Sequence, residues 1–515
     1  MSDKITLGNL RIRCRFPVIT VEQCRIHAEC GRHTEAEIVC IVKENEAETV
    51  ITQTGEDTLE IVGRKEDGKD EILFFGVIRR LELNEEGDFA SLRLWAASHT
   101  WRMDIQRKSR SFQDLSQTYR EVAEAVLEDY KGAAVWNIPD RQLTHPLIQY
   151  KETDYVFLKR IMSHLGACVT AEDVKAGTAV HVGMRKGIHR GDLDIGRYAH
   201  SLVHHREGCA GQGAGYEIHD MDYMRTGDML RIQGREFFVM ASETIFVHNV
   251  LSCTCRVFPA QCFTQKEIPA HTLEGAVLEG KVLSTGKELV RLHLDIDREQ
   301  SFGGAYDFPW KPFTGNLFYS MPEPGTRAAL YFGRACEESG EVIYNIRENG
   351  ESCGELADYH DRFFTTENKK QMYLKPSEMG LLNREGNNAQ IALKDDSLVQ
   401  VRSEHRISML AEGRVELKGK NVTVTAPKEA TLVRKDMLSP TVINLCNAFD
   451  AIGRKGSFAA SEPLAEKKKR APGGEIWEDR YPIEGAVSAI LSNIPMDGEG
   501  DPVMEKIAGS MPVII

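Results

Sequence analysis

The sequence has no long hydrophobic run, no signal-like N-terminus and no paired cysteines. No stretch of the 515 residues approaches the roughly 18 apolar residues of a membrane-spanning helix. The first residues, MSDKITLGNLRIRCRF, lack an apolar core followed by small residues, so we expect no secretory signal peptide. The 12 cysteines are scattered without a CxxC pair or a repeated Cys/His spacing that would suit zinc. These absences predict a protein made in the cytosol with reduced thiols.

Positive charge is also scarce. The chain has 64 Lys and Arg against 77 Asp and Glu, a net charge of −13. A nucleic-acid-binding surface needs clustered Lys and Arg for phosphate contacts, so we expect no nucleic acid as a partner. The one dense basic run, at 467–470, lies in a stretch flanked by Pro and Gly and is interpreted as a solvated linker.

Signatures of catalysis and of metal binding are missing as well. No HExxH or Cys–His pattern occurs, and the GxSxG spacing at 350–354 falls in a polar stretch that is expected to be a linker. Residues 275–282 have the spacing of a phosphate-binding loop, but Val282 stands where Ser or Thr must hold magnesium. His293, Asp295 and Asp297 alternate as on the exposed face of a half-buried strand, and we prefer that interpretation to a metal cluster. We therefore predict a non-enzyme without catalytic, cofactor-binding or metal-binding residues and without a cofactor.

Short alternating apolar runs dominate the first half of the chain. At 42% apolar residues, a chain of this length can form roughly three or four domains. Runs such as EIVCIVKE and ILFFGVIRRLEL predict strands. Helical patterns occur near 111–131, where Gly132 ends the stripe, and near 153–166, where Thr153 or Asp154 can cap the helix. Strands resume up to residue 258, so residues 1–264 predict two small barrel-like domains with flanking helices.

The pattern starts again near residue 265. About 80 residues of short strands without a long helix predict a five-stranded barrel of the OB kind at 265–350. A polar linker is expected at 351–370, followed by a repeat region at 371–435. The last part, 436–515, is expected to be partly helical, with a helix in 439–456 and a flexible stretch around the basic run.

The repeat region contains apolar pairs at positions i and i+2. The pairs begin every eight residues, with one step of seven, and are Ile391/Leu393, Val399/Val401, Ile407/Met409, Val415/Leu417, Val422/Val424 and Ala430/Leu432. Both residues of a pair lie on one face of a strand. A single-chain solenoid needs about 20 residues per coil to enclose a core, so eight residues can supply only one wall. Three identical chains would close a triangular prism with these 12 side chains inside.

An antiparallel sheet of successive hairpins is the alternative to this prism. Hairpins of such spacing are common, but no Asn-Gly or Asp-Gly turn separates the pairs. We prefer the three-chain prism, but the spacing of the pairs does not exclude an antiparallel sheet of hairpins.

Several motifs, in their order, resemble the VgrG family and the related phage late-control D and baseplate hub–spike proteins. The first is QYKETDYVFLKRIMSHLG at 149–166. The second is VRLHLDIDREQ followed by FPWKPFTGNLFYSMPEPGTRAALYFG, with its Met-Pro-Glu-x-Gly step at 321–325. The repeats at 391–432 then resemble the needle of that family.

This resemblance implies a mainly β fold: two small hub β-barrels with flanking helices, an OB-fold-like barrel and an intertwined triple-stranded β-helix of a homotrimer. It implies a baseplate hub and membrane-puncturing spike of a contractile injection system, which joins the inner tube to the tip and delivers effectors. The implied partners are the inner tube protein, baseplate components, a PAAR-like tip protein or effector, and the target cell envelope. Assembly would take place in the bacterial cytoplasm, with delivery outward on contraction.

Two departures from the family pattern keep other functions open. Leu417 and Val424 stand where phage spikes often have Gly, and residues 436–515 match no effector domain, so this extension is expected to be a tip adaptor or a cargo dock. The alternative function is a trimeric β-helical polysaccharide depolymerase. Such an enzyme needs exposed aromatics and carboxylates along its strands, whereas residues 378–435 contain no Trp, Tyr or Phe.

Overall fold

The computed structural model describes residues 5–43, 57–65, 68–86, 89–204, 211, 213–301, 303–314, 320–348, 352–384, 388–425, 431–434 and 441–444. The chain forms two compact units, Met1–Glu348 and Asn349–Ile515, and each is described by itself. No helix in these ranges is both long enough and apolar enough to span a membrane.

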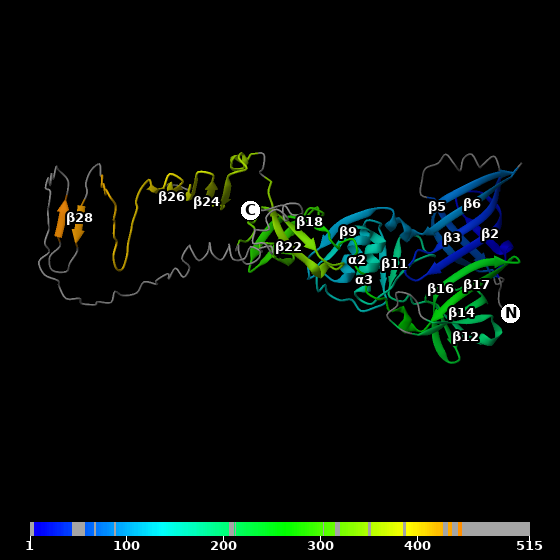
Figure 1. Ribbon diagram of the computed structural model, residues 1–515. Helices are drawn as coiled ribbons and strands as arrows, with labels where there is room; N and C mark the ends of the chain where they lie inside the picture. The colour runs from blue at the N-terminus through cyan, green and yellow to red at the C-terminus, as the bar shows by residue number, and fades with distance from the viewer. Residues whose placement is uncertain are drawn as a thin grey trace, which may run out of the picture. The chain divides into compact units, whose positions relative to one another are not determined.

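The first unit is built around one sheet of twelve strands. Its main path runs β1-β4-β5-β6-β3-β2-β16-β17-β14-β13, and β15 joins β12 to β16. The strands are β1 (Leu10–Arg13), β2 (Val18–Glu29), β3 (Glu35–Lys43), β4 (Thr58–Arg64), β5 (Asp70–Glu86), β6 (Phe89–Ser98), β12 (His189–Leu193), β13 (His200–His204), β14 (Ala214–Met221), β15 (Met229–Ile232), β16 (Arg235–Val247) and β17 (Val250–Phe258). Figure 1 shows β2, β3, β5 and β6 beside β16 and β17.

The two expected barrels are therefore not separate. They share a sheet because β2 pairs with β16 in antiparallel register, with Ile26 opposite Thr244. Alternate residues of both halves point into one core, which includes Ile38 and Cys40 from β3 and Val257 from β17. Over the described residues the hydrogen-bonded path stays open rather than closing into a barrel.

A smaller α/β part is inserted between the two halves of that sheet. Its elements are η2 (His99–Asp104), β7 (Arg107–Phe112), α2 (Tyr119–Glu128), β8 (Ala133–Trp136), β9 (Leu147–Thr153), α3 (Asp154–Ser163), β10 (Val169–Ala171) and β11 (Ala179–Val182). β8 pairs in parallel with β11, and β7 pairs with β9. The described residues of the first unit also form the short helices η1 (Leu7–Asn9), η3 (Ile195–Arg197), η4 (Ala260–Phe263) and η6 (Glu337–Ser339).

The two helices match the sequence pattern to different degrees. α3 is capped by Thr153, whose hydroxyl accepts from the Val156 backbone 3.4 Å away, and the chain turns at Gly166 with a φ of +67°. The helix expected near 111–131 begins only at Tyr119, after a capping box. Phe112, which fits the helical spacing, instead ends β7 opposite Leu147. Pairing with β9 outweighs the helical pattern there.

The OB-like part is a five-stranded sheet in the order β20-β19-β18-β21-β22. Its strands are β18 (Val277–Gly286), β19 (Leu289–Leu294), β20 (Asp307–Pro309), β21 (Arg327–Phe332) and β22 (Gly340–Ile346). The phosphate-loop-like residues 275–282 run into β18, so they form a strand. Ile148 of β9 is fully buried in the core of this sheet, so the OB-like and α/β parts pack as one body.

The second unit contains a five-stranded antiparallel meander in the order β23-β24-β25-β26-β27 (Figure 1). Its strands are β23 (Arg362–Thr365), β24 (Lys370–Lys375), β25 (Glu378–Asn383), β26 (Ala389–Lys394) and β27 (Leu398–Ser403). The helix η7 (Gly354–Leu356) precedes it, and β28 (Thr431–Arg434) pairs with β29 (Thr441–Asn444).

Two boundary predictions were wrong here. β23 lies within the expected linker 351–370, because two adjacent phenylalanines extend the sheet by one strand. Residues 441–444 form a strand rather than part of a helix. The rest of the expected extension, 436–440 and 445–515, lies outside the described residues.

A buried arginine holds the α/β part to the OB-like part. Arg160 of α3 is 1% exposed. Its guanidinium forms an ion pair with Glu337 of η6, a second pair with Glu152 of β9 at 3.0 Å, and a hydrogen bond to the Ile148 carbonyl at 2.8 Å. The opposing carboxylates keep the pKa of Arg160 raised even though burial alone would lower it. The joint therefore depends on a paired buried charge.

A second network holds the α/β part to the large sheet. Arg225 donates to Glu172 at 2.8 Å and to Asp173, and Glu172 also contacts His181 Nε2 at 3.1 Å. Burial would raise the pKa of Glu172, but the hydrogen bond to His181 and the charge of Arg225 outweigh it and hold the pKa below its ordinary value. Folding therefore favours the ionised carboxylate.

We expect Arg160→Met to lower the free energy of unfolding by about 3–5 kcal/mol, since it leaves two buried carboxylates without a countercharge. The matched control is Arg120→Met, which removes an exposed i,i+4 pair with Glu124 and should cost about 0.3–0.5 kcal/mol. Urea unfolding of the full chain, followed by tryptophan fluorescence, measures both. Equal losses in the two variants would contradict a stabilising role for the buried network.

The Glu172 network predicts an acid-sensitive fold. The depressed pKa means that the unfolded carboxylate, with its pKa of about 4.3, takes up a proton first as the pH falls. The contribution of the ionised Glu172 carboxylate to the free energy of unfolding is complete above the unfolded-state pKa and is lost progressively as the pH falls below it. We expect Glu172→Gln to be less stable than wild type at pH 7 and to lose less stability between about pH 5 and pH 3. The exposed Glu236→Gln variant should keep the wild-type pH dependence in urea unfolding, and an unchanged slope in Glu172→Gln would refute the assignment.

Candidate functional site

The meander of the second unit exposes one apolar face. Strand register places its side chains in two rows that cross the sheet. The first row is Phe364, Met372, Leu381, Ile391 and Val401, and the second is Leu374, Met379, Leu393 and Val399. These nine side chains are 41% to 65% exposed in the single chain. A continuous apolar surface of this kind marks an interaction site.

The opposite face of the meander is already satisfied within the chain. Tyr373 is 3% exposed and lies against Gly380, where an added Cβ would come within 2.7 Å of the Tyr373 hydroxyl. Gln390 donates to that hydroxyl at 2.8 Å, and Ala392 is fully buried. The two faces therefore differ, and among the described residues the continuous apolar surface lies on the face with the two rows.

A groove runs along the first apolar row. It has a volume of about 510 Å³, and its lining includes Met372, Leu381, Ile391, Val401 and Ile407. Ile407 belongs to the next expected repeat, so the apolar surface continues past the end of β27. The groove suits a packed protein partner, since the apolar row along it is flanked by polar residues such as Lys370, Asn383 and Arg402.

The structure brings only some of the 12 expected core residues together. Ile391, Leu393, Val399 and Val401 lie on the apolar face. Six more lie in 404–425, a described stretch without a regular strand, and are 52% to 76% exposed: Ile407, Met409, Val415, Leu417, Val422 and Val424. Ala430 lies outside the described residues. Leu432 belongs to β28, where only the backbone is described.

Sequence reasoning missed the first half of this face. Met372/Leu374 and Met379/Leu381 have the same i, i+2 pairing, but the next pair begins 12 residues later, at Ile391. A loop between β25 and β26 breaks the eight-residue rhythm. The i, i+2 apolar pairs at 372/374 and 379/381 could have identified these strands. They were missed because only pairs that begin about every eight residues were considered.

Between 362 and 403 the strands pair as successive hairpins of one chain, which is the alternative that the spacing left open. The missing Asn-Gly turns do not prevent it, because Ser397 adopts a φ of +63° in the turn between β26 and β27. Winding of three chains around one another stays a prediction for the repeats that follow.

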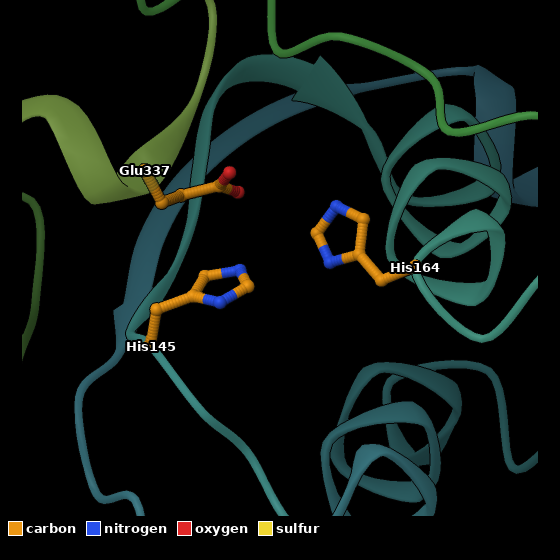
Figure 2. A group of neighbouring side chains, drawn as sticks. All are labelled: His145, His164 and Glu337. Carbon is orange, nitrogen blue, oxygen red and sulfur yellow. The ribbon is translucent and has the colours of Figure 1, made fainter.

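A separate cluster lies where the α/β part meets the OB-like part. His145, His164 and Glu337 each direct one ligand atom toward the others, and these atoms all lie within 4.8 Å of one another (Figure 2). His145 lies on the segment before β9, His164 caps the C-terminus of α3, and Glu337 begins η6. Among the described residues, these three form the group of side chains that could bind a metal ion. Their spacing in the sequence matches no metal-binding motif, so the sequence did not predict this group.

Burial sets the charge state of the cluster. It lowers the pKa of His164 to about 4, so this imidazole is neutral at pH 7. Burial opposes ionisation of Glu337, but the charge of Arg160 outweighs it and lowers the pKa of this carboxyl. The cluster thus combines a neutral imidazole with a carboxylate.

The candidates considered from sequence as a metal cluster have other partners. Asp297 accepts from the Ser111 backbone and hydroxyl, both at 2.5 Å, and Asp295 pairs with Arg327. His293 Nε2 lies 3.1 Å from the Asp297 carbonyl. Asp297 is therefore half-buried in the joint rather than on a free strand face.

Comparison with known proteins places the fold. Residues 44–214 match the family model of the phage tail baseplate hub (GPD). No curated protein matches the chain. The Francisella PdpA–VgrG complex in its lidded form matches with a TM-score of 0.53 at 8% identity, over 74% of this chain and 76% of that one. Its half-lidded form matches with a TM-score of 0.51 at 8% identity, over 78% and 88%.

The E. coli c3393 protein, a component of the type VI secretion system, gives a TM-score of 0.49 at 13% identity, over 65% of this chain and 100% of that one. The mainly β fold, the order of its parts and the family match agree with the resemblance seen in the motifs. The chain has a fold similar to that of VgrG, and its residues 44–214 match the phage tail baseplate hub family.

Proposed function

We propose that this hub–spike protein works as a homotrimer whose second unit forms the membrane-puncturing spike of a contractile injection system. The baseplate-hub match and the VgrG fold support the hub assignment. The observation that carries the proposal is the two-row apolar face, because its eight aliphatic side chains are 42% to 65% exposed in the described part of the chain.

The dimensions of this face favour three copies. Each of β24 to β27 contributes two apolar residues, which lie only about 7 Å apart along the strand. Such a narrow stripe fits the interior of a triangular prism better than the broad face of a two-sheet sandwich. Covering nine half-exposed side chains at roughly 1 kcal/mol each provides enough free energy for stable assembly.

The mechanical role follows from the prism. Three sheets packed on one axis leave a dry interior and a stiff rod, which is suited to transmitting an axial force. The first unit would join this rod to the inner tube and baseplate, and the far end would carry a PAAR-like tip protein or an effector. The extension 436–515, mostly outside the described residues, is the proposed tip adaptor or cargo dock. The matched proteins are structural hub and tail proteins, which supports a non-enzymatic role.

One pair of substitutions tests the assembly. Val399→Asp places a charge on the apolar face, and three such charges would be buried in a trimer. Leu398→Asp is the matched control, since Leu398 is 44% exposed on the opposite face and lies opposite Lys394. We expect size-exclusion chromatography with light scattering to show a trimer for wild type and Leu398→Asp. Val399→Asp should give single chains.

The same pair tests function in the native strain. Wild type and Leu398→Asp should restore injection to a strain lacking the gene, and Val399→Asp should not. A trimeric Val399→Asp protein would disprove the internal placement of this face. A monomeric Val399→Asp protein that still supports injection would disprove the spike role.

A further inference from the structure

We propose that His145, His164 and Glu337 bind one divalent transition metal ion of the zinc class, which clips the α/β part of the hub to the OB-like part. The site goes beyond the spike function and does not depend on it. Its ligands come from segments nearly 200 residues apart, and Figure 2 shows the three side chains pointing toward a common space.

The distances suit a tetrahedral ion after small side-chain movements. Ligand atoms around zinc lie about 2.0–2.1 Å from the ion, and therefore about 3.4 Å from one another. The three atoms here lie within 4.8 Å of one another, so binding requires each to move inward by about 1 Å. The two imidazole rings are already close, with centroids 5.3 Å apart.

The neighbouring groups orient the ligands. The Tyr119 hydroxyl lies 3.3 Å from His164 Nδ1, and the Thr144 hydroxyl lies 3.1 Å from His145 Nδ1. With Nδ1–H donating to a hydroxyl, Nε2 of each ring keeps a lone pair for the ion. Arg160 binds Oε1 of Glu337, which fixes the carboxylate and leaves Oε2 as the ligand.

The position of His164 in the fold also suits a cation. This residue sits at the C-terminus of the ten-residue helix α3, where the helix dipole favours positive charge.

The space between the ligands is large enough for an ion and a water molecule. The cavity has a volume of about 200 Å³, and its lining includes Glu267, Glu337 and Glu338 with one guanidinium, that of Arg141. Even with Glu337 paired to Arg160, the carboxylates of Glu267 and Glu338 outnumber the guanidinium of Arg141 in this lining. A water molecule in this cavity completes four-coordination. Two nitrogens and one carboxylate oxygen select Zn²⁺, Co²⁺ or Ni²⁺ over Mg²⁺ and Ca²⁺, which need mostly oxygen ligands.

The clip would act on the joint that Arg160 already holds. His145 and His164 belong to the α/β part, and Glu337 belongs to the OB-like part. An ion bound by all three resists separation of these parts when the spike is loaded along its axis. It would stabilise the folded chain only while it is bound.

The test uses the full chain after dialysis against EDTA. We expect added Co²⁺ to give one visible tetrahedral absorption band per chain, displaced by Zn²⁺ and not by Mg²⁺. Zn²⁺ at 100 times its dissociation constant should raise the unfolding midpoint by about 3–5 °C. His145→Gln should weaken binding by more than the about 10–100-fold that is typical of a lost outer-shell contact.

The matched control is His219→Gln. His219 also contacts a threonine hydroxyl, at 3.2 Å, and a glutamate, at 3.6 Å, but lies outside the cluster. The His219→Gln variant should bind Co²⁺ with the same affinity as wild type. Circular dichroism checks that His145→Gln is folded, and Glu337→Gln provides a second loss of a ligand. Absence of the Co²⁺ band in wild type, or equal Co²⁺ affinity of His145→Gln and wild type, would overturn the metal-site proposal. Neither result would bear on the proposed trimer.

Discussion

In the described part of the second unit, one face of the meander exposes a continuous apolar surface, and the need to cover that surface governs the unit. Tyr373, Ala392 and Gly380 close one face internally, while two apolar rows remain on the other. Hydrogen bonds between successive strands keep those rows aligned, so the exposed surface is continuous. The need to cover it connects the sequence pattern to the proposed assembly and to the stiffness that a spike requires.

The proposed spike function places a different demand on the first unit, which would have to stay in one piece under axial load. Its parts are held by contacts between distant segments: the Ile148 side chain in the OB-like core, the Arg160 ion pairs, and the Arg225 network on the large sheet. Charged groups at these joints are buried and paired, so each joint has a defined geometry. The proposed metal clip would add a fourth such connection at the same joint as Arg160.

Local patterns predicted local structure well. Thr153 and Gly166 delimit α3 because a cap and a left-handed stop act within a few residues. The i, i+2 pairs correctly placed Ile391 and Val401 on one face of a sheet. The predicted start of α2 was wrong because Phe112 pairs with Leu147 of β9, some 35 residues away, and therefore lies in a strand.

Contacts between distant segments left no trace in one sequence. The β2–β16 pairing joins residues 218 apart, such as Arg25 and Glu243, so the two expected barrels merged into one sheet. His145, His164 and Glu337 likewise share no spacing motif. Their proximity follows from the packing of η6 against α3, which only the folded chain shows.

The central claim is that the apolar face of the meander is the inner wall of a trimer. Native mass spectrometry of the full wild-type chain tests it most directly. The account predicts a species of three chains, and three times 57.8 kDa is about 173 kDa. A single chain of 57.8 kDa at micromolar concentration, with the nine side chains still exposed, would contradict it.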